Sequence, residues 1–449
     1  MSKWHLRKHS QAIRLSDHFG YKELLKFTFP SMVMMLFTSI YSVVDGIFVS
    51  NFVGKTPFAA INLVMPLLMF LGIIGFMIGS GGSALIAKLL GEENKEKANQ
   101  VFSMLVLVGI VSGVVFGSIG FMLVKPIVAK LGAADELLSD SVVYGRIILL
   151  ALPFFILQNM FQALMVTAER PKMGLAVTVI SGILNIVLDI LFIVVFDWGL
   201  KGSAYATLLA QMAGGLIPVM YFLSPNTSLL QIVKPTFDWR ALGQTLYNGL
   251  SEFFSDISMA VVSILYNYQL MKYIGEDGVA AYGIVMYVTF IFFTLFIGYG
   301  IGSAPIVSFH FGAKNQAELK NVFLKSINII AIMSVVLVYI TQVFALPLTK
   351  LFVSYDTDLL ETTVRAFRIY SLSFLLAGFN GYASGFFTAL NNGTVSAIIA
   401  TGRTLVCETV AVLILPLFFG LDGIWFAALF AEAMALIISG VFIIKLPFL

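Results

Sequence analysis

Apolar stretches of about 20 residues or more recur along the whole chain, separated by short polar breaks. A helix of that length spans roughly 30 Å of hydrocarbon at about 1.5 Å per residue. The stretches lack the apolar and polar alternation of a barrel strand and are too long for one, so each predicts a membrane-spanning helix. About twelve spans are expected, over residues 27–52, 57–83, 99–124, 139–166, 173–196, 202–223, 242–272, 278–304, 322–346, 362–389, 394–418 and 421–445.

The two halves of the chain resemble each other at a constant spacing. A shift of 221 residues (275 minus 54) aligns Gly54 with Gly275, and it sets the stretch GLKG at 199 against GLDG at 420. Six spans in each half give both halves the same orientation. The sequence therefore predicts a parallel repeat, related by an axis along the membrane normal.

The predicted fold is an all-α integral membrane protein, with two six-helix bundles related by a parallel pseudo-two-fold repeat. The longest polar break between spans, residues 224–244, separates the halves. We expect a cytoplasmic N-terminal segment, an N-lobe, a cytoplasmic linker and a C-lobe over residues 1–26, 27–223, 224–241 and 242–449, respectively. Rocking of two such lobes about a shared cavity is typical of transporters.

Composition supports a membrane location. Hydrophobic residues make up 59% of the chain and charged residues 11%, a balance that excludes a soluble globular protein. The single Cys407 excludes an intrachain disulfide. Basic residues form no aromatic-interleaved patch, which argues against a nucleic-acid partner. They are more frequent in the N-terminal segment and in the loops on its side, so the positive-inside rule places both termini in the cytoplasm.

A few polar side chains interrupt the spans of the first half. A charged side chain at bilayer depth costs at least about 2.5–3.5 kcal/mol, so each one that persists is a candidate for function. Spacing by four places Tyr41 with Asp45, and Asn185 with Asp189, on shared helix faces. The helical rise puts Asp45, Asp189 and Thr207 in the outer half of the membrane. The other embedded polar residues of this half are Gln158, Asn159, Gln162 and Gln211.

Two carboxylates at similar height, among amide and hydroxyl oxygens, suit either a hard monovalent cation or one shared proton. The alternative is that Asp45 and Asp189 lie so near the outer surface that they only face water or cap helix ends. A difference in depth of one helical turn separates these two interpretations.

The second half also carries embedded charges. Arg403 and Glu432 are expected at the same depth, where an ion pair between them has a structural role or a role in transport. Glu252 and Asp256 lie four residues apart and form a candidate second site, and Glu408 is a further embedded acid. His310 is expected in a polar loop, and no His falls inside an expected span.

Several motifs together resemble the multidrug and toxic compound extrusion (MATE) family, and within it the MepA-like bacterial branch. They are VVDGIFV in the first span, NIVLD in the fifth, and Gly-rich second and eighth spans that lead into paired G-x-x-N loops. The resemblance implies an antiporter that exports cationic or amphipathic drugs in exchange for Na⁺ or H⁺. It also implies a coupling site for the cation or proton in the N-lobe, at the matching positions Asp45, Asn159, Asn185, Asp189 and Thr207.

One feature departs from that family pattern. Some members pair an acid of the seventh span with an Asp of the tenth; Glu252 supplies the first, but the tenth span contains no acid over residues 367–390.

Together, the spans, the embedded acids and the family resemblance predict a Na⁺- or H⁺-coupled drug antiporter of the bacterial cell (inner) membrane. We expect it to be monomeric, surrounded by lipid and without an organic cofactor. A flippase for a lipid-linked saccharide is the alternative, and a membrane-embedded hydrolase is a more distant one.

Overall fold

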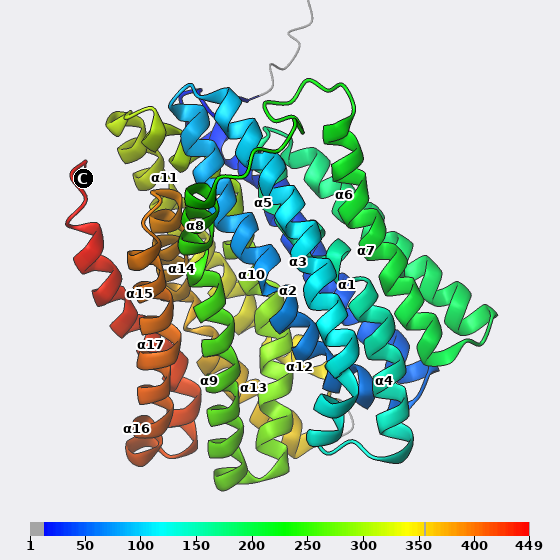
Figure 1. Ribbon diagram of the computed structural model, residues 1–449. Helices are drawn as coiled ribbons and strands as arrows, with labels where there is room; N and C mark the ends of the chain where they lie inside the picture. The colour runs from blue at the N-terminus through cyan, green and yellow to red at the C-terminus, as the bar shows by residue number, and fades with distance from the viewer. Residues whose placement is uncertain (1–12, 354–355, 449) are drawn as a thin grey trace, which may run out of the picture.

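The structure, a computed structural model, describes residues 13–353 and 356–448 (Figure 1). Over these residues all the regular elements are helices. The first half contains α1 (Tyr21–Phe52), α2 (Lys55–Gly91), α3 (Lys95–Lys130), α4 (Asp135–Leu150), α5 (Leu152–Thr167), α6 (Pro171–Asp189), η1 (Ile190–Val195) and α7 (Gly199–Leu223). The second half contains α8 (Trp239–Asn248), α9 (Leu250–Ile274), α10 (Glu276–Gly312), α11 (Gln316–Val343), α12 (Ala345–Lys350), α13 (Thr357–Ser371), α14 (Phe374–Ala389), α15 (Gly393–Thr401), η2 (Gly402–Glu408), α16 (Thr409–Phe419) and α17 (Leu421–Ile443).

Helices occupy every expected span, which confirms the predicted fold class. Within the described residues, ten helices are long and apolar enough to cross a membrane, and α4 with α5 forms an eleventh span that is bent by 54°. The bend arises where Pro153, in the first turn of α5, lacks the N–H that would continue α4. Two shorter helices, α13 and α14, occupy the expected span at 362–389.

Some boundaries differ from the predicted ones. α1 begins at Tyr21, so residues 21–26 belong to the first helix rather than to a separate N-terminal segment. Residues 1–12 of that segment lie outside the described part of the chain. In the linker region no helix is present from residue 224 to 238, and α8 then precedes α9 with a break at Gly249.

Two spans contain a stretch of π-helix, which a hydropathy pattern does not predict. η1 begins directly after Asp189, and η2 runs from Gly402 to Glu408. They lie in the fifth span of each half, and in both halves that span carries candidate acids. π-helical turns are rare and are frequent at functional sites, because the extra residue shifts the side chains that follow to a new face.

The backbone repeats at the same spacing as the sequence. Positive φ angles occur at Gly54 (120°) and Gly275 (69°), and again at Gly199 (54°) and Gly420 (59°). Both pairs are 221 residues apart (275 minus 54, 420 minus 199). Glycine adopts such angles without steric cost, so the glycines that align in sequence also form equivalent turns. The predicted internal repeat is thus present in the backbone.

The two halves meet where α2 crosses α10, and these two helices are equivalent in the repeat. A Cβ atom built on Gly91 would overlap the carbonyl oxygen of Phe309, and one built on Gly312 would overlap the carbonyl oxygen of Lys88. Residues 91 and 312 differ by 221, as do 88 and 309, so each contact is the repeat of the other. Such a reciprocal contact is what a two-fold relation between similar surfaces produces.

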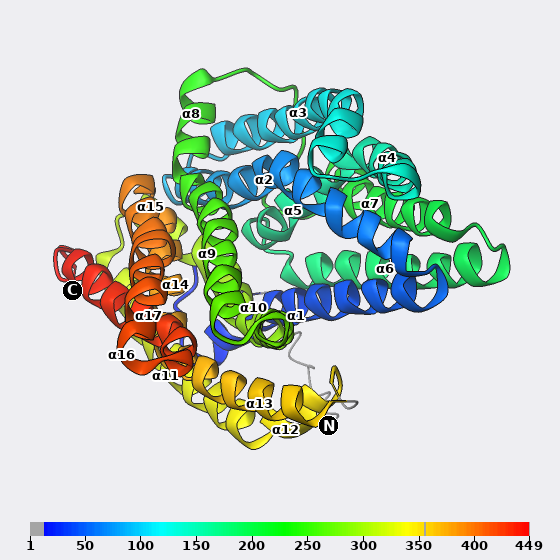
Figure 2. The same ribbon diagram turned by 90° about the horizontal axis from the view of Figure 1, so that it is seen from below.

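A second reciprocal pair of contacts involves the first helix of each half. Gly302 of α10 packs against Thr28 of α1, and Gly81 of α2 packs against the backbone at Gly249, just before α9. Viewed from below, α1 and α10 lie side by side where the halves meet (Figure 2). These close contacts all fall in the helix portions nearest one side of the molecule. We call this side, uppermost in Figure 1, the N-terminal face; it also carries residues 13–20 and 224–238.

We predict that side chains cannot be added at the α2–α10 crossing. Gly91→Ala and Gly312→Ala should each destabilise the protein by about 1–3 kcal/mol, the usual cost of overpacking a tight contact. Gly300→Ala, in the same helix as Gly312, is the matched control, because its Cβ would meet nothing within 4 Å. Thermal unfolding in detergent measures the difference, and equal midpoints for all three variants would contradict the predicted role of the crossing.

Candidate functional site

Asp45 and Asp189 meet inside the first half. Asp45 lies in α1 and Asp189 is the last residue of α6, a helix that packs along α1. Asp189 is fully buried, and neither of its carboxyl oxygens accepts a hydrogen bond from a described residue; the same holds for Oδ1 of Asp45. The two carboxyl groups interact electrostatically, so the charge of one affects the other. They therefore do not face bulk water as separate surface groups.

Two tyrosines extend this acid pair. Tyr144 of α4 is fully buried, its hydroxyl has no hydrogen-bond partner among the described residues, and it lies within electrostatic range of both acids. Tyr41, one turn before Asp45, lies near Gln158 of α5 and within electrostatic range of Asp45. Sequence reasoning missed Tyr144, because a tyrosine near the end of a span is equally typical of the aromatic belt at a membrane interface.

Further polar atoms are buried on the neighbouring helices. The amide nitrogen of Asn185, the hydroxyl of Thr207 and the amide oxygen of Gln211 are all buried without a hydrogen-bond partner among the described residues. Unpaired polar atoms are costly in a protein interior, so their presence on adjoining helices needs a reason. No group of three or more His, Cys, Asp or Glu in the described chain is placed to bind a metal. A cation in this region would use two carboxylates with amide and hydroxyl oxygens, a donor set suited to a hard ion.

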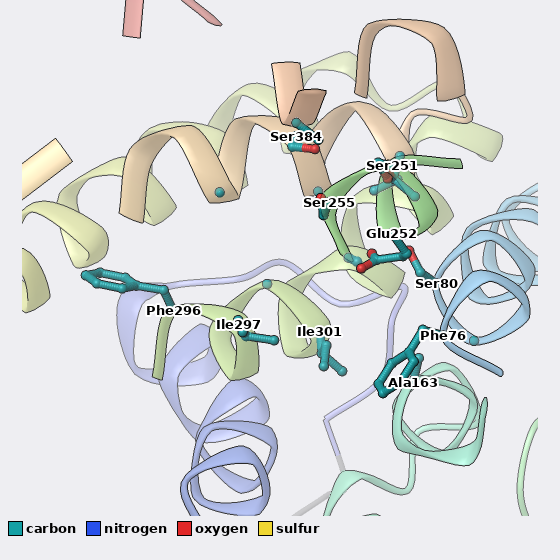
Figure 3. Close-up of a pocket in the computed structure, with 18 of the residues that line it drawn as sticks. Phe76, Ser80, Ala163, Ser251, Glu252, Ser255, Phe296, Ile297, Ile301 and Ser384 are labelled. Carbon is teal, nitrogen blue, oxygen red and sulfur yellow. The ribbon is translucent and has the colours of Figure 1, made fainter. Parts of the chain in front are cut away.

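Asn159 and Gln162 lie in the wall of a pocket between the two halves. The pocket has a volume of about 290 Å³, and none of Asp45, Asn185, Asp189 and Thr207 lines it. Its other walls come from α2, α9, α10, α14, α15 and η2, several of which are seen in Figure 3. The amide nitrogen of Asn159 is also buried without a hydrogen-bond partner among the described residues.

Glu252 and Asp256 of α9 line the same pocket. Glu252 lies next to Ser80 on α2, and Figure 3 shows the two side chains side by side across the junction of the halves. The pocket therefore combines acids of the second half with amides of the first, among Phe and Ile side chains such as Phe296 and Ile301.

Arg403 and Glu432 form the expected ion pair. Nε of Arg403 lies 3.0 Å from Oε1 of Glu432, and Asn380 donates a hydrogen bond of 2.7 Å to the other carboxyl oxygen. The guanidinium also lies over the ring of Phe293, 5.4 Å from its centroid. Asn380 belongs to α14, so an amide of the tenth span contacts an acid of the twelfth. Glu408 is separate from this pair and accepts a hydrogen bond of 3.1 Å from the hydroxyl of Tyr266.

The expectation for His310 is wrong. Its side chain is not solvated in a loop, because it lies in the last turn of α10 and is only 3% exposed. The apolar run ends several residues earlier in the sequence, but the helix continues beyond it and packs against the other half, as the crossing at Gly312 shows.

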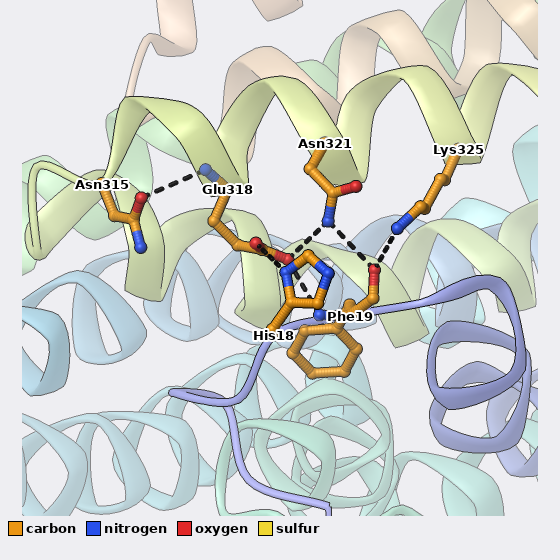
Figure 4. Close-up of polar contacts among 6 residues, drawn as sticks. All are labelled: His18, Phe19, Asn315, Glu318, Asn321 and Lys325. Carbon is orange, nitrogen blue, oxygen red and sulfur yellow. Dashed lines mark hydrogen bonds and ion pairs between the residues drawn. The ribbon is translucent and has the colours of Figure 1, made fainter.

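On the N-terminal face a strap, residues 13–20, connects the two halves. Leu15 N donates to Oε1 of Glu169, between α5 and α6, at 2.6 Å, and burial raises the pKa of the Glu169 carboxyl. Four residues later, Phe19 N donates to Glu318 of α11 at 2.9 Å, and Lys325 Nζ donates to Phe19 O at 2.8 Å (Figure 4). Leu15 and Phe19 are both fully buried. The strap therefore holds both halves at once.

These features define a transporter, because two repeated helix bundles enclose a shared pocket and bury acids that a membrane otherwise excludes. The MatE family model matches residues 30–191 and matches again over residues 253–414. The chain belongs to the MatE family, and the two matches place one copy of the repeat in each half. The predicted resemblance is confirmed.

Relatives named Multidrug export protein MepA extend over almost the whole chain. The protein of Staphylococcus saprophyticus subsp. saprophyticus is 26% identical over 417 residues, which cover 92% of this chain and 91% of that protein. The protein of Staphylococcus haemolyticus is 25% identical and covers 95% and 94%, respectively. Among solved structures, an outward-facing multidrug resistance MATE family transporter has a TM-score of 0.90 and 23% identity, covering 96% of this chain and 97% of that chain. The structural likeness concerns the fold.

We predict that loss of one partner of the Arg403–Glu432 pair destabilises the protein more than loss of both. Glu432→Gln leaves the Arg403 charge without its partner in a buried position, and breaking one side of such a pair costs about 3–5 kcal/mol. The double variant Arg403→Met with Glu432→Gln removes both charges and should recover most of that loss. Thermal unfolding of the two variants tests this. A double variant as unstable as the single one would contradict it.

Proposed function

We propose that the chain is a cation-coupled antiporter that exports cationic or amphipathic drugs from a bacterial cell by alternating access between its two lobes. The observation that carries the proposal is the meeting of Asp45 and Asp189, two acids in adjoining membrane helices that have no basic partner among the described residues. The name of the MepA relatives, multidrug export proteins, supports the substrate class.

The acid pair is suited to coupling because its charge depends on what it binds. Two ionised carboxylates in a low dielectric repel each other, so a proton or a Na⁺ ion between them relieves the repulsion. Tyr144, Asn185 and Thr207 supply polar atoms nearby that have no other partner among the described residues. Binding of the ion changes the packing of α1 against α6, and α1 also packs along α10 of the other lobe. The ion thereby favours one arrangement of the lobes over the other.

The drug is held in the pocket between the lobes. Its acids, Glu252 and Asp256, attract a positive group, and its Phe and Ile side chains contact the apolar part of the molecule. In the proposed orientation the N-terminal face and both termini are cytoplasmic, in the inner membrane. Because the lobes are packed together on that face, this arrangement is the outward-facing one. Reciprocal coupling requires that ion and drug favour different arrangements.

The charges of the pocket favour drug export over lipid-linked saccharide transport. A flippase for such a substrate needs basic residues for the pyrophosphate group, and the one basic residue in the lining is Arg403, which is already paired with Glu432. The pocket is therefore better matched to a cation than to a diphosphate.

We predict that Asp45→Asn and Asp189→Asn each uncouple transport. Ethidium efflux from proteoliposomes, driven by an imposed ion gradient, should fall by about 5–150-fold, the range of typical coupling free energies. Asp277→Asn, at an exposed acid near the start of α10, is the matched control and should retain wild-type efflux. Imposing Na⁺ and proton gradients separately identifies the coupling ion. Gradient-driven efflux that persists in both variants would refute the coupling role.

A further inference from the structure

The second half contains a chamber of its own, distinct from the pocket between the lobes. Its volume is about 570 Å³, within the range of about 300–1,000 Å³ that is typical of small-molecule sites. All of its lining residues belong to the second half. The chamber and the pocket share a wall that consists of Met259, Phe293, Arg403 and Thr404.

The lining of the chamber is rich in aromatic rings and thioethers. The aromatic residues are Tyr282, Tyr287, Phe290, Phe293, Tyr370 and Phe374. Met259 and Met286 add flexible, polarisable surface that adapts to ligands of different shapes. Aromatic faces attract cations through their quadrupoles, and Arg403 over Phe293 already shows that interaction in the shared wall. The walls are therefore suited to a positively charged, partly apolar molecule.

The charges of the chamber do not balance. Three charged residues line it: Arg403, Glu408 and Glu432. Arg403 pairs with Glu432, whose second carboxyl oxygen is bound by Asn380. Glu408 has no basic partner within the described chain, and its one hydrogen-bond donor there is the hydroxyl of Tyr266. When both acids are ionised, the lining carries one more negative than positive charge, at a depth where a lone charge is costly.

Tyr266 also orients Glu408 relative to the aromatic rings of the chamber. The Tyr266 ring stacks on Tyr282 with centroids 4.8 Å apart and planes at 11°, and its edge meets Tyr370. Tyr282 and Tyr370 are lining residues of the chamber, so the acid and two aromatic faces are fixed by one packed group. η2, which ends at Glu408, supplies Arg403 and Glu408 to the same cavity from a single π-helical stretch.

We propose that this chamber is a binding site for an organic monocation, with Glu408 as its counter-charge and Tyr282 and Tyr370 as its aromatic walls. The substrate class rests on the proposed function, but the site does not involve Asp45 or Asp189. The shared wall places it next to the pocket between the lobes, so that a bound cation has two adjoining positions in the second half.

Equilibrium binding to purified wild-type protein tests the proposal, with ethidium as the monocation and N-phenyl-1-naphthylamine as an uncharged aromatic. Glu408→Gln should weaken ethidium binding roughly tenfold and leave binding of the uncharged probe unchanged, as expected for loss of one charge–charge interaction in a partly buried site. Tyr282→Leu should weaken ethidium binding as well, whereas Tyr282→Phe retains the ring and should bind almost as wild type does. Glu276→Gln, at an acid in the first turn of α10 outside the lining, is the charge-matched control.

The position of the ligand is tested by thiol labelling. In a Cys407→Ser background, Ser263→Cys lies in the chamber lining and Ser255→Cys in the pocket lining. Ethidium should protect the first thiol from a maleimide, and Glu408→Gln should remove that protection. Protection of Ser255→Cys alone would overturn the proposal.

Three other outcomes separate this inference from the proposed function. If Glu408→Gln alters proton-driven efflux but leaves the ethidium dissociation constant unchanged, Glu408 carries only a proton and the chamber is not a cation site. If Asp45→Asn abolishes coupled efflux while chamber binding persists, both proposals hold. If wild-type protein binds ethidium in the chamber but shows no gradient-driven efflux, the proposed function fails and the binding site stands.

Discussion

The cost of placing charge in hydrocarbon governs this protein. Few ionisable side chains lie inside its helices, and they occur together rather than scattered: Asp45 meets Asp189, and Arg403 meets Glu432. The two arrangements solve the problem differently. Arg403 and Glu432 neutralise each other permanently, whereas two acids that face each other are stable only when something positive accompanies them. A neutral ion pair is suited to a structural role, whereas two acids without a basic partner are suited to exchange with an ion.

Pseudo-symmetry explains why the two lobes approach so closely on one side. Glycines at equivalent positions let α2 and α10 cross with backbone against backbone, and Gly302 and Gly81 do the same for the first helix of the other half. A duplicated bundle meets its copy through the same surface twice, so one small residue in the ancestral repeat serves two contacts. The halves also differ in their polar residues: Gln211 aligns with Glu432, and only the second half has a basic residue embedded beside its acids.

The hydropathy pattern was sufficient for the spans and for the repeat, because both follow from periodicity and length. The helical rise predicts a similar depth for Asp45 and Asp189, and likewise for Arg403 and Glu432; in the structure the members of each pair interact with each other. The remaining features depend on contacts between distant segments. Tyr144 has no local signature that separates it from an interfacial tyrosine. The placement of Glu252 and Glu408 in different cavities depends on how helices that are distant in the sequence pack together. π-helical turns are equally invisible, since one extra residue hardly changes an apolar pattern. His310 is buried because α10 continues beyond the apolar run of its sequence.

The strap at residues 13–20 has a consequence for biogenesis. Leu15 and Phe19 are synthesised early, but their partners Glu169 and Glu318 follow 154 and 299 residues later. During translation Leu15 must wait until the first four spans are made, and Phe19 must wait until all of the first lobe and the seventh and eighth spans are made. Contacts this distant in sequence form late, because loop closure is costly until both ends are held by other structure. Fastening of the strap therefore marks the completion of assembly, after each bundle has already folded.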